Sequence, residues 1–319
     1  MKRIGLLTSG GDAPGMNAAI RSVVRSGLYF GMEVYGIERG YAGLIDNNLV
    51  KMEMRSVSNI VQCGGTKLRT ARCLDMLTKE GQQKALATLE KNGIEGLVVI
   101  GGDGSFRGAK VLSEYGIPTI GIPGTIDNDL AYTDYTLGFD TAVNTCIDVI
   151  NKLRDTMTSH ERVCVVEVMG RHCGDIALYS GIASGAEIIV VPEIEFNMDE
   201  IVAKIRSSRA NGKHSNIVVI AEGVMSAAKF AEQLQAVTEY SVRPTCIGHV
   251  QRGGSPSMSD RMLAAQFGNK AVRLLNEGIG NRVVGIHDNH IIDMDIIEAV
   301  SMKKTFNYEL YETLQTISM

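Results

Sequence analysis

The chain has 319 residues, of which 45% are apolar and 21% charged, and its formal net charge is −4. This length favours two domains, and the composition is that of a soluble globular protein without an apolar run near the ~20 residues of a membrane span. The mild acidity argues against long nucleic acid as a partner, and the scattered cysteines, without a C-x-x-C pair, do not indicate a zinc or redox site. Met1-Lys2-Arg3 leads straight into an apolar segment and lacks the regions of a signal peptide, so we expect a cytoplasmic protein.

Short apolar runs rich in isoleucine and valine alternate with helix-like stretches along the chain. Strands that are hydrophobic on both faces and separated by helices are typical of a covered parallel sheet, so the predicted fold class is α/β. In such sheets ligands bind at the carboxyl ends of the strands, where glycine-rich turns let backbone N–H groups meet phosphate. We predict strands at residues 4–7, 97–100, 119–122, 163–168, 188–191 and 217–221.

Glycine-rich turns follow the first two predicted strands. Residues 8–15 read T-S-G-G-D-A-P-G and precede a stretch with the 3.6-residue apolar period of a helix. Residues 101–108 read G-G-D-G-S-F-R-G, which misses the dinucleotide pattern G-x-G-x-x-G by one residue, and a G-x-x-x-x-G-K-[ST] loop is absent. A carboxylate among phosphate-binding glycines would repel the ligand without a divalent ion, so Asp103 is a candidate magnesium ligand. The alternative is a turn aspartate that only binds its own backbone.

Later turns add carboxylates and cations. Residues 123–129, P-G-T-I-D-N-D, offer one carboxylate for a metal and one to accept a proton, although an Asx-rich turn is the alternative. In residues 169–175, M-G-R-H-C-G-D, Arg171 can meet charge that grows during phosphoryl transfer, while we expect His172 to be structural. Residues 248–255, G-H-V-Q-R-G-G-S, suit a sugar phosphate, or a cap with a surface ion pair. The phosphate-competent cations in and around these turns are Arg72, Arg162, Arg171, Arg243 and Arg252, with His249.

The whole chain resembles the bacterial ATP-dependent 6-phosphofructokinases through five motifs in register. They are T-S-G-G-D-A-P-G-M-N, G-G-D-G-S, P-G-T-I-D-N-D, M-G-R-H-C-G-D and G-H-V-Q-R-G-G-S-P. The resemblance implies transfer of the γ-phosphoryl group of Mg-ATP to the 1-hydroxyl of fructose 6-phosphate. It also implies two doubly wound, three-layer α/β/α domains with mainly parallel sheets. Residues 1–138 plus 251–301 would form the larger domain, which binds ATP and Mg²⁺, and 139–250 plus 302–319 the smaller, which binds fructose 6-phosphate.

The resemblance further implies a role for each matching residue. Asp127 would be the base for the sugar hydroxyl, and Arg171 and Arg72 would stabilise the transferred phosphoryl charge, with Thr125 and Gly11 completing the catalytic set. The implied ATP contacts are Gly11, Arg72, Cys73, Gly102, Asp103, Gly104 and Ser105, with Asp103 as the Mg²⁺ ligand. The implied fructose 6-phosphate contacts are Thr125, Ile126, Asp127, Met169, Gly170, Arg171, Glu222, His249, Val250, Gln251 and Arg252, with Arg162 and Arg243 from a neighbouring subunit of a homotetramer.

Two glycines favour ATP as the phosphoryl donor. Pyrophosphate-dependent relatives carry aspartate at the position of Gly104 and lysine at that of Gly124, filling space that ATP needs. A pyrophosphate-dependent enzyme stays the alternative within the family. A non-catalytic sugar-phosphate sensor is another, against which the joint presence of Asp103, Asp127 and Arg171 argues. Lipid or nicotinamide kinases share the Gly-Gly-Asp-Gly turn, but they do not explain the downstream arginines and His249.

An effector site for ADP or phosphoenolpyruvate is implied only in part. Asn59, Asn211, His214 and Ser215 stand where family members usually carry other residues, and among these changes about two cations are lost. Each lost charge-assisted bond removes roughly 1.5–3 kcal/mol, so we expect weak or altered effector control. For Arg21 and Arg25, a solvated helix face is the alternative. The effector residues that the chain retains are Arg21, Arg25, Arg154, Gly185, Glu187 and Lys213.

Overall fold

The computed structural model describes residues 1–318. By their contacts, these residues form two compact units. The resemblance implied boundaries near residues 138, 250 and 301, whereas contacts assign the short stretch Asp127–Asp129 to the second unit. The chain therefore passes between the units inside the third motif. The first unit comprises Met1–Ile126, Leu130–Thr141 and Arg252–Lys304, and the second comprises Asp127–Asp129, Ala142–Gln251 and residues 305–318.

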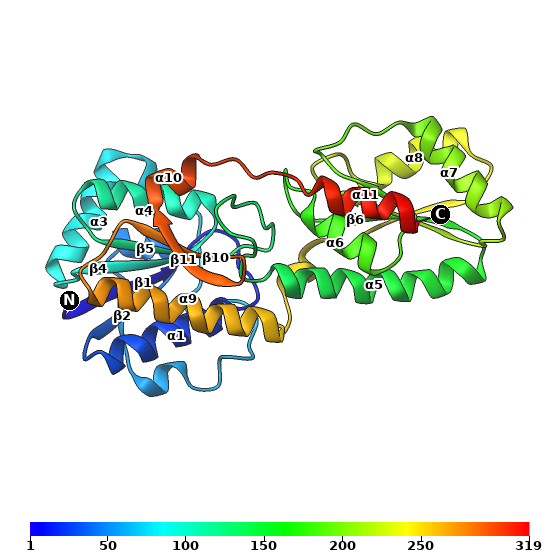
Figure 1. Cartoon of the computed structure of the whole chain (residues 1–319). Helices are drawn as coiled ribbons and strands as arrows, with labels where there is room; N and C mark the ends of the chain where they lie inside the picture. Colours follow the sequence, from blue (N-terminus) through cyan, green and yellow to red (C-terminus); the bar gives the residue numbers. More distant parts are fainter. Residues whose placement is uncertain (319) are drawn as a thin grey trace. The chain divides into compact units, whose positions relative to one another are not determined.

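Within the described residues, the first unit contains a seven-stranded sheet with helices on both faces (Figure 1). The central strands are parallel, and β3 and β11 add antiparallel edges. Every residue of β4 is buried, as expected for a valine- and isoleucine-rich strand that is covered twice. In sheet order the strands are β11 (His290–Asp295), β10 (Arg282–His287), β5 (Thr119–Pro123), β4 (Gly96–Gly101), β1 (Arg3–Thr8), β2 (Glu33–Ile37) and β3 (Leu49–Met52).

The helices of the first unit form two layers, which confirms the predicted three-layer α/β fold. Helices α1 (Met16–Tyr29) and α9 (Met258–Asn276) pack together on one face. The other face is filled by a core cluster around Phe106, Leu89 and Leu112. That second layer consists of α2 (Gly40–Ile45), α3 (Lys79–Lys91), α4 (Asp103–Glu114) and α10 (Ile296–Ser301), with the short 3₁₀ helices η1 (Met54–Val57) and η2 (Asp75–Leu77) in connections.

The second unit is a parallel sheet of order β7-β8-β6-β9 within the described residues. Helices α7 and α8 cover one face, where Phe230 and Ile205 lie in the core. Helix α11 packs on α6 (Figure 1). The elements are α5 (Phe139–Ser159), β6 (Val163–Val168), α6 (Asp175–Ala183), β7 (Ile188–Val190), α7 (Met198–Ala210), β8 (Asn216–Ala221), α8 (Ala227–Val237), β9 (Val242–Cys246), η3 (Gly248–Arg252) and α11 (Tyr308–Ile317).

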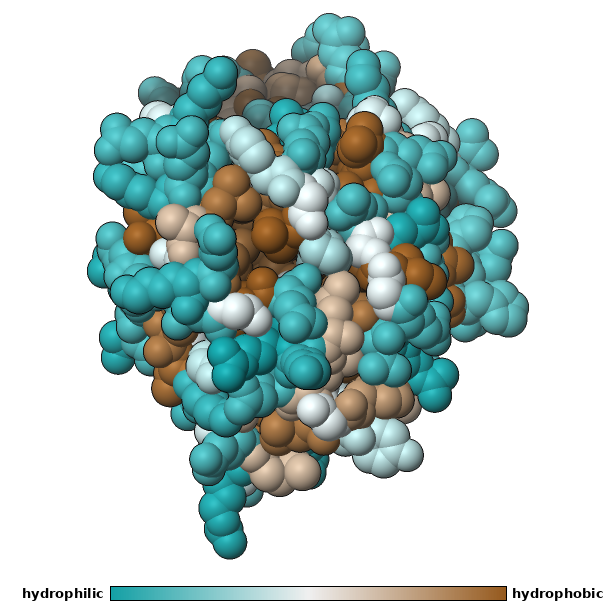
Figure 2. All heavy atoms as spheres, turned by 90° about the vertical axis from the view of Figure 1, so that its left-hand side faces the viewer, coloured by the Kyte–Doolittle hydropathy of each residue, from teal (hydrophilic) through white to brown (hydrophobic). Residues whose placement is uncertain are grey.

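The surface mixes polar and apolar side chains. On the face shown in Figure 2, hydrophilic residues cover most of the area and apolar residues gather in patches between them. Apolar side chains are common on the surfaces of folded proteins. Among residues 1–318, no helix combines the length and the apolarity needed to cross a bilayer.

Candidate active site

Three glycine-rich turns meet at the carboxyl edge of the first sheet. Ser9 N donates to Ile100 O and Gly124 N donates to Gly101 O, each at 2.9 Å. These bonds join the first turn to the second and the second to the third. The structure thereby brings together, in the first unit, the predicted residues Gly11, Gly102, Asp103, Gly104, Ser105 and Thr125.

The second turn leads directly into helix α4. Gly102 is the N-cap residue and Asp103 the first helical residue, so the N-terminal N–H groups of the helix face the turn. Asp103 is partly exposed, and its Oδ2 accepts a hydrogen bond from Arg107 Nε at 3.0 Å. A Cβ built on Gly104 would meet no described atom within 4 Å. The turn therefore combines backbone donors for phosphate, open space, and a carboxylate oxygen of the kind that Mg²⁺ prefers.

The two glycines that are predicted to select the phosphoryl donor, Gly104 and Gly124, lie in different surroundings. Gly104 faces open space, as a position that accommodates a nucleotide should. At Gly124, by contrast, a Cβ would lie 2.9 Å from a methyl carbon of Ile100 and 3.2 Å from the methyl carbon of Met16. Glycine at this second position is thus also required by packing beneath the turn.

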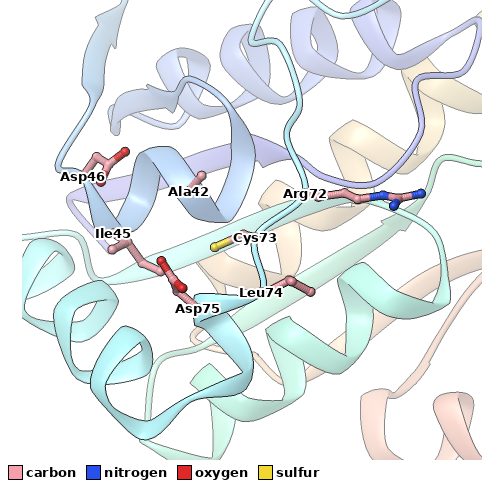
Figure 3. Close-up of a pocket in the computed structure, with 7 residues that line it drawn as sticks. All are labelled: Ala42, Ile45, Asp46, Arg72, Cys73, Leu74 and Asp75. Atoms are coloured by element: carbon pink, nitrogen blue, oxygen red, sulfur yellow. The ribbon is translucent and has the colours of Figure 1, made fainter.

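A pocket of about 310 Å³ in the first unit contains the predicted ATP contacts Arg72 and Cys73. Figure 3 shows the Arg72 guanidinium extending away from Asp46 and Asp75, so the pocket has a cationic side and an acidic side. Thr70 Oγ1 donates to Gly10 O at 2.7 Å and ties the segment before Arg72 to the first glycine turn. An anionic ligand would be held on the arginine side.

Arg252 also lies at the first turn. Its NH1 donates to Asp12 O at 3.1 Å, and a Cβ on residue 11 would collide with the guanidinium. Glycine at position 11 leaves room for this close approach. The resemblance implied that Arg252 contacts the sugar phosphate. Within the first unit, its guanidinium contacts the first glycine turn.

The second unit brings the predicted base into contact with the predicted transition-state cation. Arg171 Nε lies 3.3 Å from Asp127 Oδ2, and the arginine side chain is 61% exposed whereas the aspartate side chain is 3% exposed. Arg171 has a left-handed backbone, with φ 55°, and its N–H donates to Glu222 Oε1 at 3.0 Å. A Cβ on Gly223 would collide with Arg171 O, so the backbone at Gly223 packs directly against the turn that carries Arg171. The guanidinium can thus hold the carboxylate through Nε and present its other nitrogens to a phosphoryl group.

A pocket of about 180 Å³ in the second unit collects the predicted sugar contacts Met169, Glu222 and His249. This volume is below the range typical of drug-sized ligands and suits a small polar ligand. Glu167 also lines the pocket, and the sequence analysis missed it. A glutamate in the otherwise apolar run V-C-V-V-E-V of β6 was the signal that could have identified it. Glu167 Oε2 accepts from Ala227 N at 2.7 Å, which fixes the carboxylate. The remaining lining residues are Val168, Cys246 and Gly248.

Two of the predicted sugar contacts, Ile126 and Gln251, have buried side chains. The side chain of Ile126 is fully buried, so only its backbone is available. Gln251 is buried as well: its Oε1 accepts from Met169 N at 3.1 Å and its Nε2 donates to Gly248 O at 3.0 Å. Gln251 therefore fixes the two turns that line the pocket. Val250 is exposed, and Gly170 contributes a backbone with φ 132° that only glycine readily adopts.

Arg162 and Arg243 lie toward the start of β6 and β9, whereas the pocket lies at the carboxyl ends of these strands. Val163, which follows Arg162, pairs with Val242 at the start of the parallel strands β6 and β9, and Arg243 is the second residue of β9. The pocket lies at the other end of these strands. At ~3.3 Å per residue, Arg162 lies about 17 Å before the pocket residue Glu167 on β6, and Arg243 lies about 10 Å before the pocket residue Cys246 on β9.

Four of the residues implied for an effector site lie together in the second unit. Glu187 is 1% exposed, and its Oε1 accepts from Lys213 Nζ at 2.8 Å and from Arg154 NH1 at 3.4 Å. Both cationic side chains are therefore paired with the same buried carboxylate. Arg21 and Arg25 lie on α1 in the first unit, and burial, followed by the charge of Arg25, lowers the pKa of Arg21. The four residues are Arg154, Gly185, Glu187 and Lys213.

Comparisons with known proteins show what the chain is similar to. Residues 3–275 match the family described as Phosphofructokinase. The chain is 59% identical over 318 residues to an ATP-dependent 6-phosphofructokinase of Clostridium tetani and 57% identical over 318 residues to ATP-dependent 6-phosphofructokinase 1 of Clostridium perfringens, and each match covers 100% of both chains. Among solved structures, a phosphofructokinase from Saccharomyces cerevisiae superposes with a TM-score of 0.93 at 34% identity, covering 99% of this chain and 50% of that chain.

Proposed function

The chain belongs to the phosphofructokinase family, and from this premise we propose how its residues share the reaction. It is an enzyme that transfers the γ-phosphoryl group of ATP to the 1-hydroxyl of fructose 6-phosphate, giving fructose 1,6-bisphosphate and ADP. Phosphoryl transfer requires positioning and charge neutralisation rather than covalent chemistry by the protein. The single observation that carries the assignment of roles is the contact between Asp127 and Arg171.

On the donor side, the glycine turns and the start of α4 bind the phosphates of ATP. Arg72 and Cys73 line the pocket that takes part of the nucleotide. Asp103 fits a divalent cation because its hard oxygen is partly exposed beside backbone phosphate donors. Asp103 would hold Mg²⁺, and the bound ion would neutralise phosphate charge.

On the acceptor side, the pocket of Met169, Glu222 and His249 holds the sugar phosphate. Asp127 accepts the proton of the 1-hydroxyl as that oxygen attacks the γ-phosphorus. The outward nitrogens of Arg171 stabilise the negative charge on the transferred group. The Asp127 contact keeps this guanidinium next to the base while its other donors remain accessible.

We expect the active sites to be shared between subunits of a homotetramer. Arg162 lies about 17 Å along β6 before Glu167, and Arg243 lies about 10 Å along β9 before Cys246, so neither arginine lines the pocket of its own subunit. This placement supports a role for both arginines at the pocket of a neighbouring copy. Analytical ultracentrifugation should give the tetramer mass, and Arg243→Ala should raise the KM for fructose 6-phosphate with little change in the KM for ATP. A fully active monomer would exclude the shared site.

The function is tested by measuring fructose 6-phosphate phosphorylation with Mg²⁺ and either ATP or pyrophosphate. We expect activity with ATP alone, because Gly104 leaves open space at the turn. Activity with pyrophosphate would show that the two glycines do not select the donor. Inactivity with both donors would favour a sensor or another sugar phosphate.

Replacing Asp103 by alanine should weaken the response to magnesium. We expect the half-saturating Mg²⁺ concentration to rise at least about tenfold, because a carboxylate ligand is lost. Both the Mg²⁺ dependence of turnover and Mn²⁺ binding, followed by electron paramagnetic resonance, report this change. Glu80→Ala is the matched control, since Glu80 is likewise a first-turn acid paired with a cation four residues on. An unchanged metal dependence in Asp103→Ala would remove Asp103 from the metal site.

Effector control should be weak. Lys213 and Arg154 are engaged by buried Glu187, so an anionic effector must compete with a carboxylate that is already in place. Asn211 and His214 supply less cationic charge than the family pattern. We expect fructose 6-phosphate saturation to stay hyperbolic with 1 mM phosphoenolpyruvate. Strong inhibition below that concentration, with sigmoidal kinetics, would contradict this proposal.

A further inference from the structure

A buried hydrogen bond links the segment of the proposed base to the turn of the proposed transition-state arginine. Asn128 Nδ2 donates to Asp175 Oδ2 at 2.8 Å. Asn128 is 1% exposed and Asp175 is 4% exposed. Both residues belong to the second unit, yet they are 47 positions apart in the chain.

The backbone at Asn128 has an uncommon conformation. Asn128 has a left-handed conformation, with φ 50°, which residues with a side chain adopt uncommonly and asparagine tolerates best. Cys173 Sγ makes a weak contact of 3.9 Å with Asn128 O. Both contacts come from the turn at residues 169–175. The peptide that follows Asp127 is therefore fixed by this turn.

The same turn presents Arg171. Cys173 N donates to Gly170 O at 2.9 Å and closes the turn around Arg171. Asp175 begins helix α6, so its carboxylate sits on a rigid element. The base and the arginine, whose side chains lie 3.3 Å apart, are thus carried by two segments that the Asn128–Asp175 bond joins.

We propose that Asn128 and Asp175 are a positioning pair that aligns the Asp127 carboxylate with the Arg171 guanidinium for phosphoryl transfer. This inference rests on the proposed roles of Asp127 and Arg171. Neither member of the pair touches the reacting atoms. The pair acts on the orientation of the base, and a misplacement of about 1 Å can cost up to about a hundredfold in rate.

The test compares kcat and the KM for fructose 6-phosphate in Asp175→Ala, Asn128→Ala, the double variant and Asp175→Asn. We expect each alanine variant to lower kcat about 10- to 100-fold while KM changes less than about threefold. The double variant should be no slower than the slower single variant, because both remove one interaction. Asp175→Asn should recover most of kcat, because its amide oxygen accepts the same hydrogen bond from Asn128.

Asp199→Ala is the matched control, since Asp199 is an exposed acid in the first turn of α7. A kcat within about threefold of wild type in both alanine variants, or losses that multiply in the double variant, would overturn the proposal. If Asp175→Ala fails to fold, as judged by circular dichroism, Asn128→Ala together with Asp175→Asn decides the question. Asp127→Ser, measured in parallel, distinguishes failure of the proposed base from failure of the positioning pair. Near-normal activity in Asp127→Ser would refute the role of Asp127 as base. An inactive Asp127→Ser together with an unimpaired Asn128→Ala would refute only the positioning pair.

Discussion

Replacing Asp127 by serine is expected to lower kcat by about 10²- to 10⁴-fold, the range that loss of a general base typically costs. The carboxylate is nearly buried and lies 3.3 Å from Arg171, which supports its proposed role as the base for the sugar hydroxyl. The KM for fructose 6-phosphate should change much less, because the pocket residues Met169, Glu222 and His249 remain. Steady-state assays with ATP and saturating Mg²⁺ measure both constants.

The control for this experiment is Asp148→Ser. Asp148 is an exposed carboxylate on α5 that pairs with Lys152, and its removal should leave kcat unchanged. If Asp127→Ser keeps near-normal turnover, Asp127 is not the base. An equal loss in both variants would indicate a general loss of folded protein.

Arg171→Ala should lower kcat by about 10²- to 10³-fold, which is the cost of losing one preorganised donor to developing charge. Its guanidinium is largely exposed apart from the Nε contact with Asp127, and it gains most of its interaction as negative charge grows on the transferred group. The fall in kcat should therefore exceed the rise in KM for either substrate. Arg171→Lys should restore little, because a lysine lacks the planar donors that hold two groups at once.

Arg206→Ala provides the comparison for Arg171→Ala. Arg206 is an exposed arginine on α7 that pairs with Glu239, far in the sequence from the motifs. We expect its kcat to match wild type. If Arg171→Ala raised KM with kcat unchanged, Arg171 would be a ground-state binding residue.

The sequence predicted the strands that carry the site with good accuracy. The runs at 97–100, 119–122 and 163–168 became β4, β5 and β6 because β-branched residues buried on both faces leave a clear pattern. The outer strands β2, β3, β10 and β11 were not predicted. Each of these strands includes half-exposed or exposed residues and at least one polar residue or glycine, so no fully buried apolar run marks them.

The motifs could not predict the direction in which each side chain of the site points. Ile126 and Gln251 stand inside matching motifs, yet their side chains are buried and serve packing and hydrogen bonding. Glu167 lies outside every motif and lines the pocket. A motif fixes which residue types occur at a strand end, whereas the alternation of the strand and the backbone angles of the turn decide which of them face the ligand.

Because the chain passes between the units at several points, neither unit can be produced by a single truncation. Cutting after residue 141 would remove β10, and β5, whose residues are all buried, would become an exposed, aggregation-prone sheet edge. A fragment of residues 142–251 would keep the four strands and every residue that lines the 180 Å³ pocket, but it would lack Asp127. A genetic dissection of this protein would therefore separate the proposed sugar pocket from the proposed base.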